Sequence, residues 1–393
     1  MKVYYYDHCA STPMYPKVIE TVTELMKLHY ANAAALHRSG AEAMKLVERA
    51  RTSIAERMGA QPQEVIFTSG GTESNNLAIK GSLFKVTRPS KHIITTAIEH
   101  ASVYECVQQL ESWGIEVTVL PVNHEGMVDP REVHKAIRKD TVLVSVMHVN
   151  NETGVIQPIQ EIGDIVSKYP QIRFHVDGVQ AIGKVPVSWK ESGVHLYSGS
   201  AHKFGGPKGT GFLLVKEGIE LAPLLSGGDQ ENGVRSGTHN VPGIVGMAQA
   251  LRLSLEDRDR RRQLMYELRR QLLGIVAEIP ELLVNGIYSD QMEVDEQHTA
   301  PHVISLSYPG MRPEVLVHML EKHGIQVSTQ SACSSKSLKP SRVLLAMGYD
   351  EDRASGCIRI SFGDEHTSND IEILGERLKL AMAKLKPLER NHR

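Results

Sequence analysis

The 393-residue chain has few cysteines, few aromatic side chains and almost no net charge. Its cysteines form no CxxC pair, which argues against a zinc site or a disulfide framework. A formal net charge of -2 gives no bulk attraction to nucleic acid or anionic membranes. No apolar run approaches the roughly 18 residues that a membrane-spanning helix needs. The first residues lack a signal-peptide pattern, so we expect a cytoplasmic protein.

The length exceeds the size at which one hydrophobic core stops growing, so two domains are expected. Apolar runs typical of strands alternate with helical patterns at 102–113, 130–139 and 159–168. This alternation predicts an α/β protein with a mainly parallel sheet and ligands beyond the carboxyl ends of its strands. The expected strands are residues 64–67, 92–95, 116–120, 142–148, 173–177, 196–200 and 211–215.

Residues 242–276 are expected to form one long charged helix. The mixed signs of residues 256–262 favour a solvated helix face over a nucleic-acid patch. Segments at 303–306, 315–322 and 358–362 predict a smaller α/β domain. We therefore expect a large domain over residues 15–250, and a small domain made of residues 1–14 with 251–393.

Three polar segments follow expected strands. Gly71 and Thr72 begin a helix pattern after a strand, which suits a phosphate but also a plain glycine turn with a threonine N-cap. Asp177 ends a buried strand and needs a partner, which could be a cation, a protonated ring nitrogen or a helix N-terminus. His100 could stack on a ring or transfer protons, or be an ordinary structural histidine.

Lys203 lies between small hydroxyl residues and a glycine-rich loop. A lysine in a confined site can form a Schiff base, and the flanking Ser200 and His202 could donate to a phosphate. A surface lysine is the plain alternative, which suits Lys208 in its turn-forming segment better.

Cys333 lies in a small, polar segment that is unsuited to a core element. The nearby Lys336 and Lys339 would favour its thiolate, as a nucleophile needs. The alternative is a chance surface cysteine that is prone to oxidation.

Together these segments resemble the cysteine desulfurases of the NifS/IscS type, in order and over nearly the whole chain. The matching pieces are TSGGTESNN, IEHASV, VNNETG, HVDGVQ, SGSAHKFGGPKG, VRSGTHN, SACSS and IRISFG. The resemblance implies a fold type I pyridoxal-phosphate enzyme that acts as a homodimer. SACSS implies the subgroup whose active cysteine lies in a longer, mobile loop.

The resemblance also implies a role for each matching residue. Lys203 holds pyridoxal 5'-phosphate as a Schiff base, Asp177 pairs with the ring nitrogen, and Gln180 contacts the ring hydroxyl. His100 stacks on the ring and assists proton transfer. The phosphate is held by Gly71, Thr72, Ser200, His202 and, from the other protomer, Thr238, while Asn151 and Arg359 lie near the substrate, with Arg359 on its carboxylate.

The implied reaction takes sulfur from L-cysteine, with Lys203 as the base at the α-carbon. The Cys333 thiolate attacks the substrate sulfur, which leaves alanine and a persulfide on Cys333. The persulfide sulfur is then expected to pass to an acceptor protein, either an iron–sulfur scaffold or a tRNA sulfurtransferase. The short segment after Gly363 puts docking of a scaffold in doubt, which makes the tRNA sulfurtransferase a plausible acceptor. No metal site is assigned, although Cys333 could transiently ligate an iron–sulfur cluster. His8 and Cys9 differ from common family residues, and we expect neither to touch the central chemistry.

Other classes of function fit the residues less well. Selenocysteine lyase activity or transamination could use Lys203 and Asp177, but neither explains the Cys333 segment as well. A non-catalytic scaffold related to pyridoxal-phosphate enzymes should have lost Lys203 or Cys333, and both are present. A nicotinamide dehydrogenase lacks its GxGxxG signature here.

Overall fold

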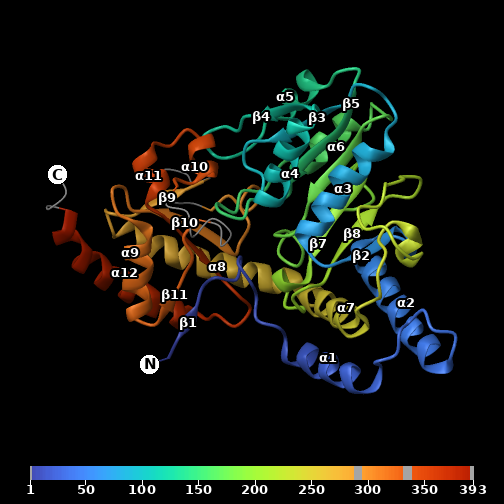
Figure 1. Cartoon of the computed structure of the whole chain (residues 1–393). Coiled ribbons are helices and arrows are strands. Elements are labelled where there is room, and N and C mark those ends of the chain that lie inside the picture. Colours follow the sequence, from blue (N-terminus) through green and yellow to red (C-terminus); the bar gives the residue numbers. More distant parts are fainter. Residues whose placement is uncertain (1, 287–293, 331–338, 390–393) are drawn as a thin grey trace.

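The computed structural model describes residues 2–286, 294–330 and 339–389 (Figure 1). Its larger sheet has the strand order β2-β8-β7-β6-β5-β3-β4, and only the two pairs that involve β8 are antiparallel. The predicted mainly parallel α/β sheet is therefore confirmed. Its strands are β2 (Val65–Thr68), β3 (His92–Thr96), β4 (Glu116–Leu120), β5 (Thr141–Met147), β6 (Arg173–Asp177), β7 (Leu196–Ser200) and β8 (Gly211–Val215).

Burial on both faces explains the composition of this sheet. Every residue of β3, β5 and β7 is buried, as expected where helices cover both faces of a parallel sheet. Two pairs of helices pack together, α3 with α4 and α5 with α6. Their bounds are α3 (Gly71–Lys85), α4 (Ala101–Ser112), α5 (Pro130–Ala136) and α6 (Ile159–Val166).

Three further helices complete the first hydrophobic core. Helices α1 (Pro16–Leu28) and α2 (Arg38–Met58) both pack on α7 (Val241–Leu255). Helix α2 is capped at its start by His37, whose side chain accepts a hydrogen bond from the Gly40 N–H, and at its end by Gly59 in the left-handed conformation. Val47, Ile54 and Met247 join strand residues in this core.

The single long helix predicted over residues 242–276 is wrong. Helix α7 ends at Leu255 and α8 (Arg258–Ala277) begins after Asp257, which has a φ of 51°. The Arg261 guanidinium donates hydrogen bonds to the Leu253 and Glu256 carbonyls, which the break leaves without helical partners. Because charged residues favour a helix on both sides, the sequence pattern does not reveal the break.

The break separates the first hydrophobic core from a second one. Leu251 belongs to the first core, whereas Leu268 and Leu272 of α8 belong to the second. Around the second core lie an antiparallel sheet, β12-β10-β9, and helices α9 and α12, whereas the buried residues of α10 and α11 pack in a separate cluster with Ile98 and Met147. The bounds are β9 (Leu283–Asn285), β10 (Val303–Ser307), β12 (Cys357–Ser361), α9 (Pro313–Lys322), α10 (Arg342–Ala346), α11 (Glu351–Ser355) and α12 (Ser368–Glu389). That these cores act as the two expected domains stays a prediction.

The N-terminal segment lies against the second core before the chain enters α1 (Figure 1). Strand β1 (Tyr4–Tyr5) pairs in parallel with β11 (Ile325–Gln326), and Asp7 bridges to Ser361 beyond it. The backbone after Asp7 then reaches Lys203, where the Thr12 N–H donates to the His202 carbonyl at 2.8 Å. This path places residues 8–12 between the two cores. Across the described ranges, no helix has the length and apolar character to span a membrane.

Candidate active site

A cavity of ≈ 180 Å³ lies at the carboxyl ends of β6 and β7. This is the edge at which parallel α/β sheets bind ligands. Most of the residues that the sequence singled out line it. They are Gly71, Thr72, His100, Asn151, Asp177, Gln180, Ser200, His202, Lys203 and Arg359.

Two predicted residues are not among those that line the cavity. Thr238 is exposed, in the segment between Gly233 and α7. Cys333 lies outside the described residues, in the gap between 330 and 339. Their assigned roles stay predictions.

A chain of hydrogen bonds joins Asp177 to His100. The Asn75 amide donates to Asp177 Oδ2 and to Ser102 Oγ, each at 2.8 Å. Ser102 Oγ lies 2.8 Å from His100 Nδ1, which also accepts from the Ser102 backbone at 3.2 Å. With Nδ1 accepting, a neutral His100 carries its proton on Nε2. The carboxylate and the imidazole are thus positioned by one helix residue, Asn75.

Burial sets the protonation of this chain. Desolvation lowers the pKa of His100. The Asp177 charge raises this pKa, whereas the positive charges of Lys203 and Arg359 lower it further. His100 is therefore a neutral hydrogen-bonding group at neutral pH. Asp177 Oδ1 also accepts from the Val179 N–H at 3.0 Å, so both carboxylate oxygens have donors.

Asn75 and Ser102 received no role in the sequence reasoning. Asn75 follows Gly71 by four residues on α3, which places it on the helix face that carries the glycine. That spacing was the available signal. Ser102 follows His100 directly as the residue that its side chain caps, a local N-cap pattern.

Lys203 follows β7 on a short 3₁₀ turn (Ala201–Lys203) and is held by the N-terminal segment. Its Nζ donates to the Cys9 carbonyl and, at 3.1 Å, to the Ala10 carbonyl. The Gln180 amide also donates to the Cys9 carbonyl, at 3.0 Å. Cys9 thus contacts Lys203 through its main-chain oxygen, while the expectation that its side chain takes no part in the central chemistry stays a prediction. The contact uses a main-chain oxygen, which every residue type has, so no side-chain pattern could reveal it.

The start of α3 and the end of β7 form a polar cradle. Gly70 has a φ of 151°, a region that favours glycine, and a Cβ at Gly71 would lie 2.7 Å from Val179 Cγ2. Burial lowers the pKa of His202 to about 4, with Lys203 and Lys208 adding to the effect. His202 is thus neutral at working pH and can donate one hydrogen bond. A helix N-terminus with Thr72, Ser200 and His202 suits a phosphate.

Arg359 of β12 enters the cavity from the opposite side. It is 1% exposed, donates to Asp7 Oδ1 at 2.9 Å, and donates to the Asn151 carbonyl at 2.9 Å. A planar guanidinium that faces a cavity matches a substrate carboxylate. Binding such a carboxylate through two nitrogens would require Arg359 to exchange part of these contacts.

The residues of this cavity fit pyridoxal phosphate. A carboxylate, an imidazole, a lysine amine and the glycine-lined cradle face one space. Asn75 Oδ1 is also buried without a hydrogen-bond partner among the described residues. A lysine, a carboxylate for the ring nitrogen and a phosphate cradle are the groups that this cofactor requires.

Comparisons with known proteins agree with this geometry. A family described as aminotransferase class-V matches residues 4–374. The chain is 42% identical over 385 residues to a Dictyoglomus turgidum protein named cysteine desulfurase IscS, over 98% of this chain and 95% of that protein.

Solved structures give the same result. One described as a NifS-like protein matches with a TM-score of 0.89 and 36% identity, over 98% of this chain and 100% of that one. Another, described as SspA in complex with cysteine, matches with a TM-score of 0.78 and 33% identity, over 92% of this chain and 99% of that one. The resemblance and the fold class that the motifs indicated are both confirmed.

Proposed function

This chain belongs to the aminotransferase class-V family and, within it, to the NifS/IscS cysteine desulfurases, and on that premise we propose that it transfers sulfur from L-cysteine to Cys333. The observation that carries the proposal is the single cavity that Lys203, Asp177, His100 and Arg359 share. A related protein has been solved in complex with cysteine, which supports this amino acid as the substrate.

Pyridoxal phosphate, when bound, supplies an electron sink for negative charge at the substrate α-carbon. Lys203 would hold the cofactor covalently, Asp177 its ring nitrogen and Gln180 its ring hydroxyl. Gly71, Thr72, Ser200 and His202 would hold the phosphate, and His100 would cover the ring. The hydrogen bonds from Asn75 and Val179 keep Asp177 in place for this task.

The protein residues then carry the reaction in a defined order. Arg359 binds the substrate carboxylate, with Asn151 beside it. Lys203 accepts the proton from the α-carbon, and the neutral His100 donates a hydrogen bond from Nε2.

The sulfur leaves the substrate through Cys333. The Cys333 thiolate forms a bond to the substrate sulfur as the carbon–sulfur bond breaks. The electron pair of that bond stays with the carbon fragment, which gains protons and leaves as alanine. The protein retains the sulfur as a persulfide.

A persulfide assay tests the proposal. The purified protein with its cofactor is incubated with L-cysteine, and the peptide that contains Cys333 is examined by mass spectrometry after alkylation. We expect one added sulfur on Cys333, and none in Cys333→Ser or Lys203→Ala. Sulfide release at the normal rate by Cys333→Ser would contradict the role of Cys333.

We also propose a homodimer in which Thr238 reaches the phosphate of the partner's cavity. Its exposure, and its absence from the cavity of its own chain, support this arrangement. Mixed dimers of Lys203→Ala and Thr238→Ala chains test it. If the cavities share Thr238, one of the two sites in a mixed dimer is intact, and activity per mixed dimer rises above that of either parent. No gain in activity would exclude the shared site.

The persulfide would pass to an acceptor protein in the cytoplasm, where thiols stay reduced. The proposed acceptor is an iron–sulfur scaffold or a tRNA sulfurtransferase. Trapping the acceptor with labelled cysteine distinguishes them, because only the true acceptor gains the label from Cys333. Label on neither class would exclude both.

A further inference from the structure

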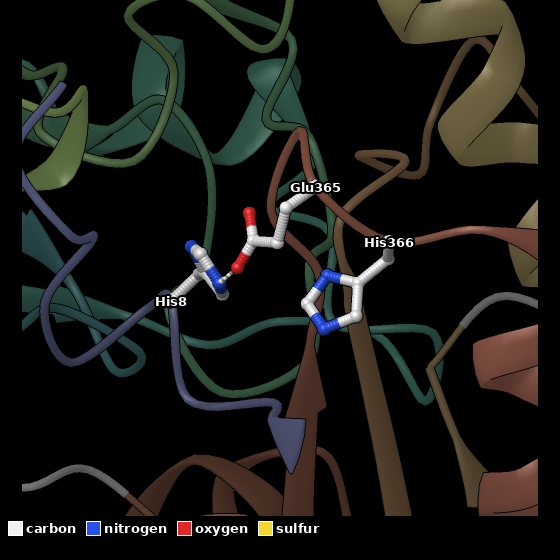
Figure 2. A group of neighbouring side chains, drawn as sticks. All are labelled: His8, Glu365 and His366. Carbon is white, nitrogen blue, oxygen red and sulfur yellow. Dashed lines mark hydrogen bonds and ion pairs between the residues drawn. The ribbon is translucent and has the colours of Figure 1, made fainter. Parts of the chain in front are cut away.

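A second cluster of polar side chains lies outside the cavity, between the N-terminal segment and the loop after β12 (Figure 2). It consists of His8, Glu365 and His366. His8 Nε2 lies 2.8 Å from Glu365 Oε1, and one ligand atom of each residue lies within 4.8 Å of the others. Figure 2 shows the Glu365 carboxylate pointing to the His8 ring, with the His366 ring beside them.

The two imidazoles are buried and the carboxylate opens to solvent. His8 is 2% exposed and His366 is 5% exposed, whereas the Glu365 side chain is 56% exposed. The two rings meet edge to face, with centroids 5.4 Å apart. A small ion could therefore enter past Glu365 and reach ring nitrogens that solvent does not cover.

Neighbouring groups fix the orientation of His366. Its ring stacks on Tyr6 with centroids 4.4 Å apart. The Gly363 N–H donates to its Nδ1 at 2.9 Å, and this Nδ1 also lies 3.2 Å from the Gly363 carbonyl oxygen. To bind an ion through Nε2, His366 must take the tautomer in which Nδ1 carries the proton and donates to that carbonyl instead. A backbone carbonyl that orients an imidazole in this way is the usual support of a metal-binding histidine.

The local backbone makes room for the cluster. A Cβ at Gly363 would collide with His8 Cε1 and with Glu365 Oε2. The His8 ring and the Glu365 carboxylate thus converge over the same glycine. In addition, His8 Nδ1 is buried and has no hydrogen-bond partner among the described residues.

We propose that His8, Glu365 and His366 bind a divalent transition-metal ion of the zinc class. Two imidazoles and one carboxylate suit zinc, whereas calcium and magnesium prefer oxygen ligands. Ligand atoms around a tetrahedral zinc ion lie about 3.4 Å apart, given zinc–nitrogen bonds of about 2.1 Å. The ligand atoms of the three residues lie within 4.8 Å of one another, so binding an ion requires them to draw closer together.

The position of the cluster gives the ion a structural role. His8 is joined by one peptide bond to Cys9, whose carbonyl accepts hydrogen bonds from Lys203 and Gln180. The Cys9 N–H donates to Ser361 Oγ at 2.9 Å. An ion held by His8 and by the loop after β12 would add a second clamp between these segments. The metal site therefore holds the backbone that receives Lys203, and does not itself face the cavity.

Zinc binding by equilibrium dialysis tests the site. All variants are made in the full chain with its cofactor and with the Cys333→Ser change. This change removes a thiol that could itself bind zinc. We expect one zinc ion per chain, with nitrogen and oxygen but no sulfur ligands by zinc X-ray absorption. Loss of a residue that only supports a metal ligand by a hydrogen bond weakens metal binding roughly 10- to 100-fold. His366→Gln removes a ligand itself, so we expect it to weaken zinc binding by more than that.

Two further variants keep the test decisive. Glu365→Gln changes an exposed side chain, so the fold is not at risk, and we expect weaker zinc binding here too. His298→Gln is the matched control, because His298 pairs with Asp295 at 2.7 Å on the surface and forms no three-ligand group within the part of the chain that the structure describes; it should leave zinc binding unchanged. Three results would overturn the proposal: no zinc binds, the bound zinc has sulfur ligands, or Glu365→Gln binds zinc as tightly as the background protein.

Discussion

On one side of the cavity, His100, Asp177 and Lys203 lie at or just beyond the ends of parallel strands; we call this the strand-end side. On the other, Arg359 comes from the antiparallel sheet, and the Cys9 and Ala10 carbonyls come from the N-terminal segment; we call this the small-sheet side. On the strand-end side, Asp177 and His100 are held by hydrogen bonds through Asn75 and Ser102 of helices that pack on the same sheet, while the Lys203 amine meets the other side at Cys9. The small-sheet residues depend on contacts between segments far apart in sequence.

This difference indicates that the strand-end side suits cofactor binding and the small-sheet side suits substrate binding. A cofactor that stays in place needs residues whose partners do not change, such as Asp177 with Asn75 and Val179. A substrate that enters and leaves needs a partner that can exchange, and Arg359 has one in Asp7. Four predictions break or sharpen this comparison.

The largest effect is expected for Lys203→Ala on the strand-end side. Loss of both the covalent anchor and the base should lower desulfurase activity by about 10⁴-fold, the upper range for a general base. Lys208→Ala is the matched control, because Lys208 is exposed and is not among the residues that line the cavity. It should retain normal activity in the same alanine-production assay, and a comparable loss in both variants would contradict the assignment.

A smaller effect is expected for Arg359→Ala on the small-sheet side. Loss of a charge-assisted contact to the substrate carboxylate should lower kcat/KM about 100-fold, with most of the change in KM. Steady-state kinetics with L-cysteine measure it. Asp7→Asn, which removes the negative charge beside Arg359 and retains the guanidinium, should raise KM far less. If KM is unchanged in Arg359→Ala, the substrate carboxylate binds elsewhere.

Asn75→Ala should lower kcat about tenfold, since it removes one hydrogen bond to a charged group. Because Asn75 acts through Asp177 and His100, the absorbance spectrum of the bound cofactor should also shift. The neighbouring Asn76 donates to the main-chain carbonyls of Thr72 and, at 3.4 Å, Ser102, and does not contact the Asp177 carboxylate or the Ser102 hydroxyl, so Asn76→Ala should leave the spectrum unchanged. A normal spectrum in Asn75→Ala would refute the positioning role.

The smallest effect is expected for the pH dependence of the free energy of unfolding, through a buried histidine on the strand-end side. Burial lowers the pKa of His175, in β6, to about 3. Between this value and about 6.5 the unfolded chain binds up to one more proton, so the free energy of unfolding falls as pH falls. His175→Gln should flatten that slope by at most about 1.4 kcal/mol per pH unit in urea unfolding at pH 4 to 6.

His318→Gln is the control for the pH experiment. His318 is exposed on α9, and its substitution should leave the slope of the unfolding free energy unchanged. Equal slopes for His175→Gln and the unaltered chain would show that His175 is not neutral when buried.

The sequence alone determined the parallel sheet and the residues at its strand ends. Strand segments carry a local apolar pattern, and β4, β6, β7 and β8 begin and end where that pattern does. Gly71, Asp177 and Lys203 were recognisable because a small or charged residue interrupts the apolar pattern at the end of a buried strand or three residues beyond it.

Only the tertiary structure decided which distant segments meet. The contact of Lys203 with the Cys9 carbonyl, the convergence of His8 with Glu365 and His366, and the break at Asp257 all depend on the packing of one core against another. Main-chain oxygens are the same in every residue, and long-range proximity leaves no period in the sequence. Local patterns thus predicted the strand-end side, and packing between segments decided the small-sheet side.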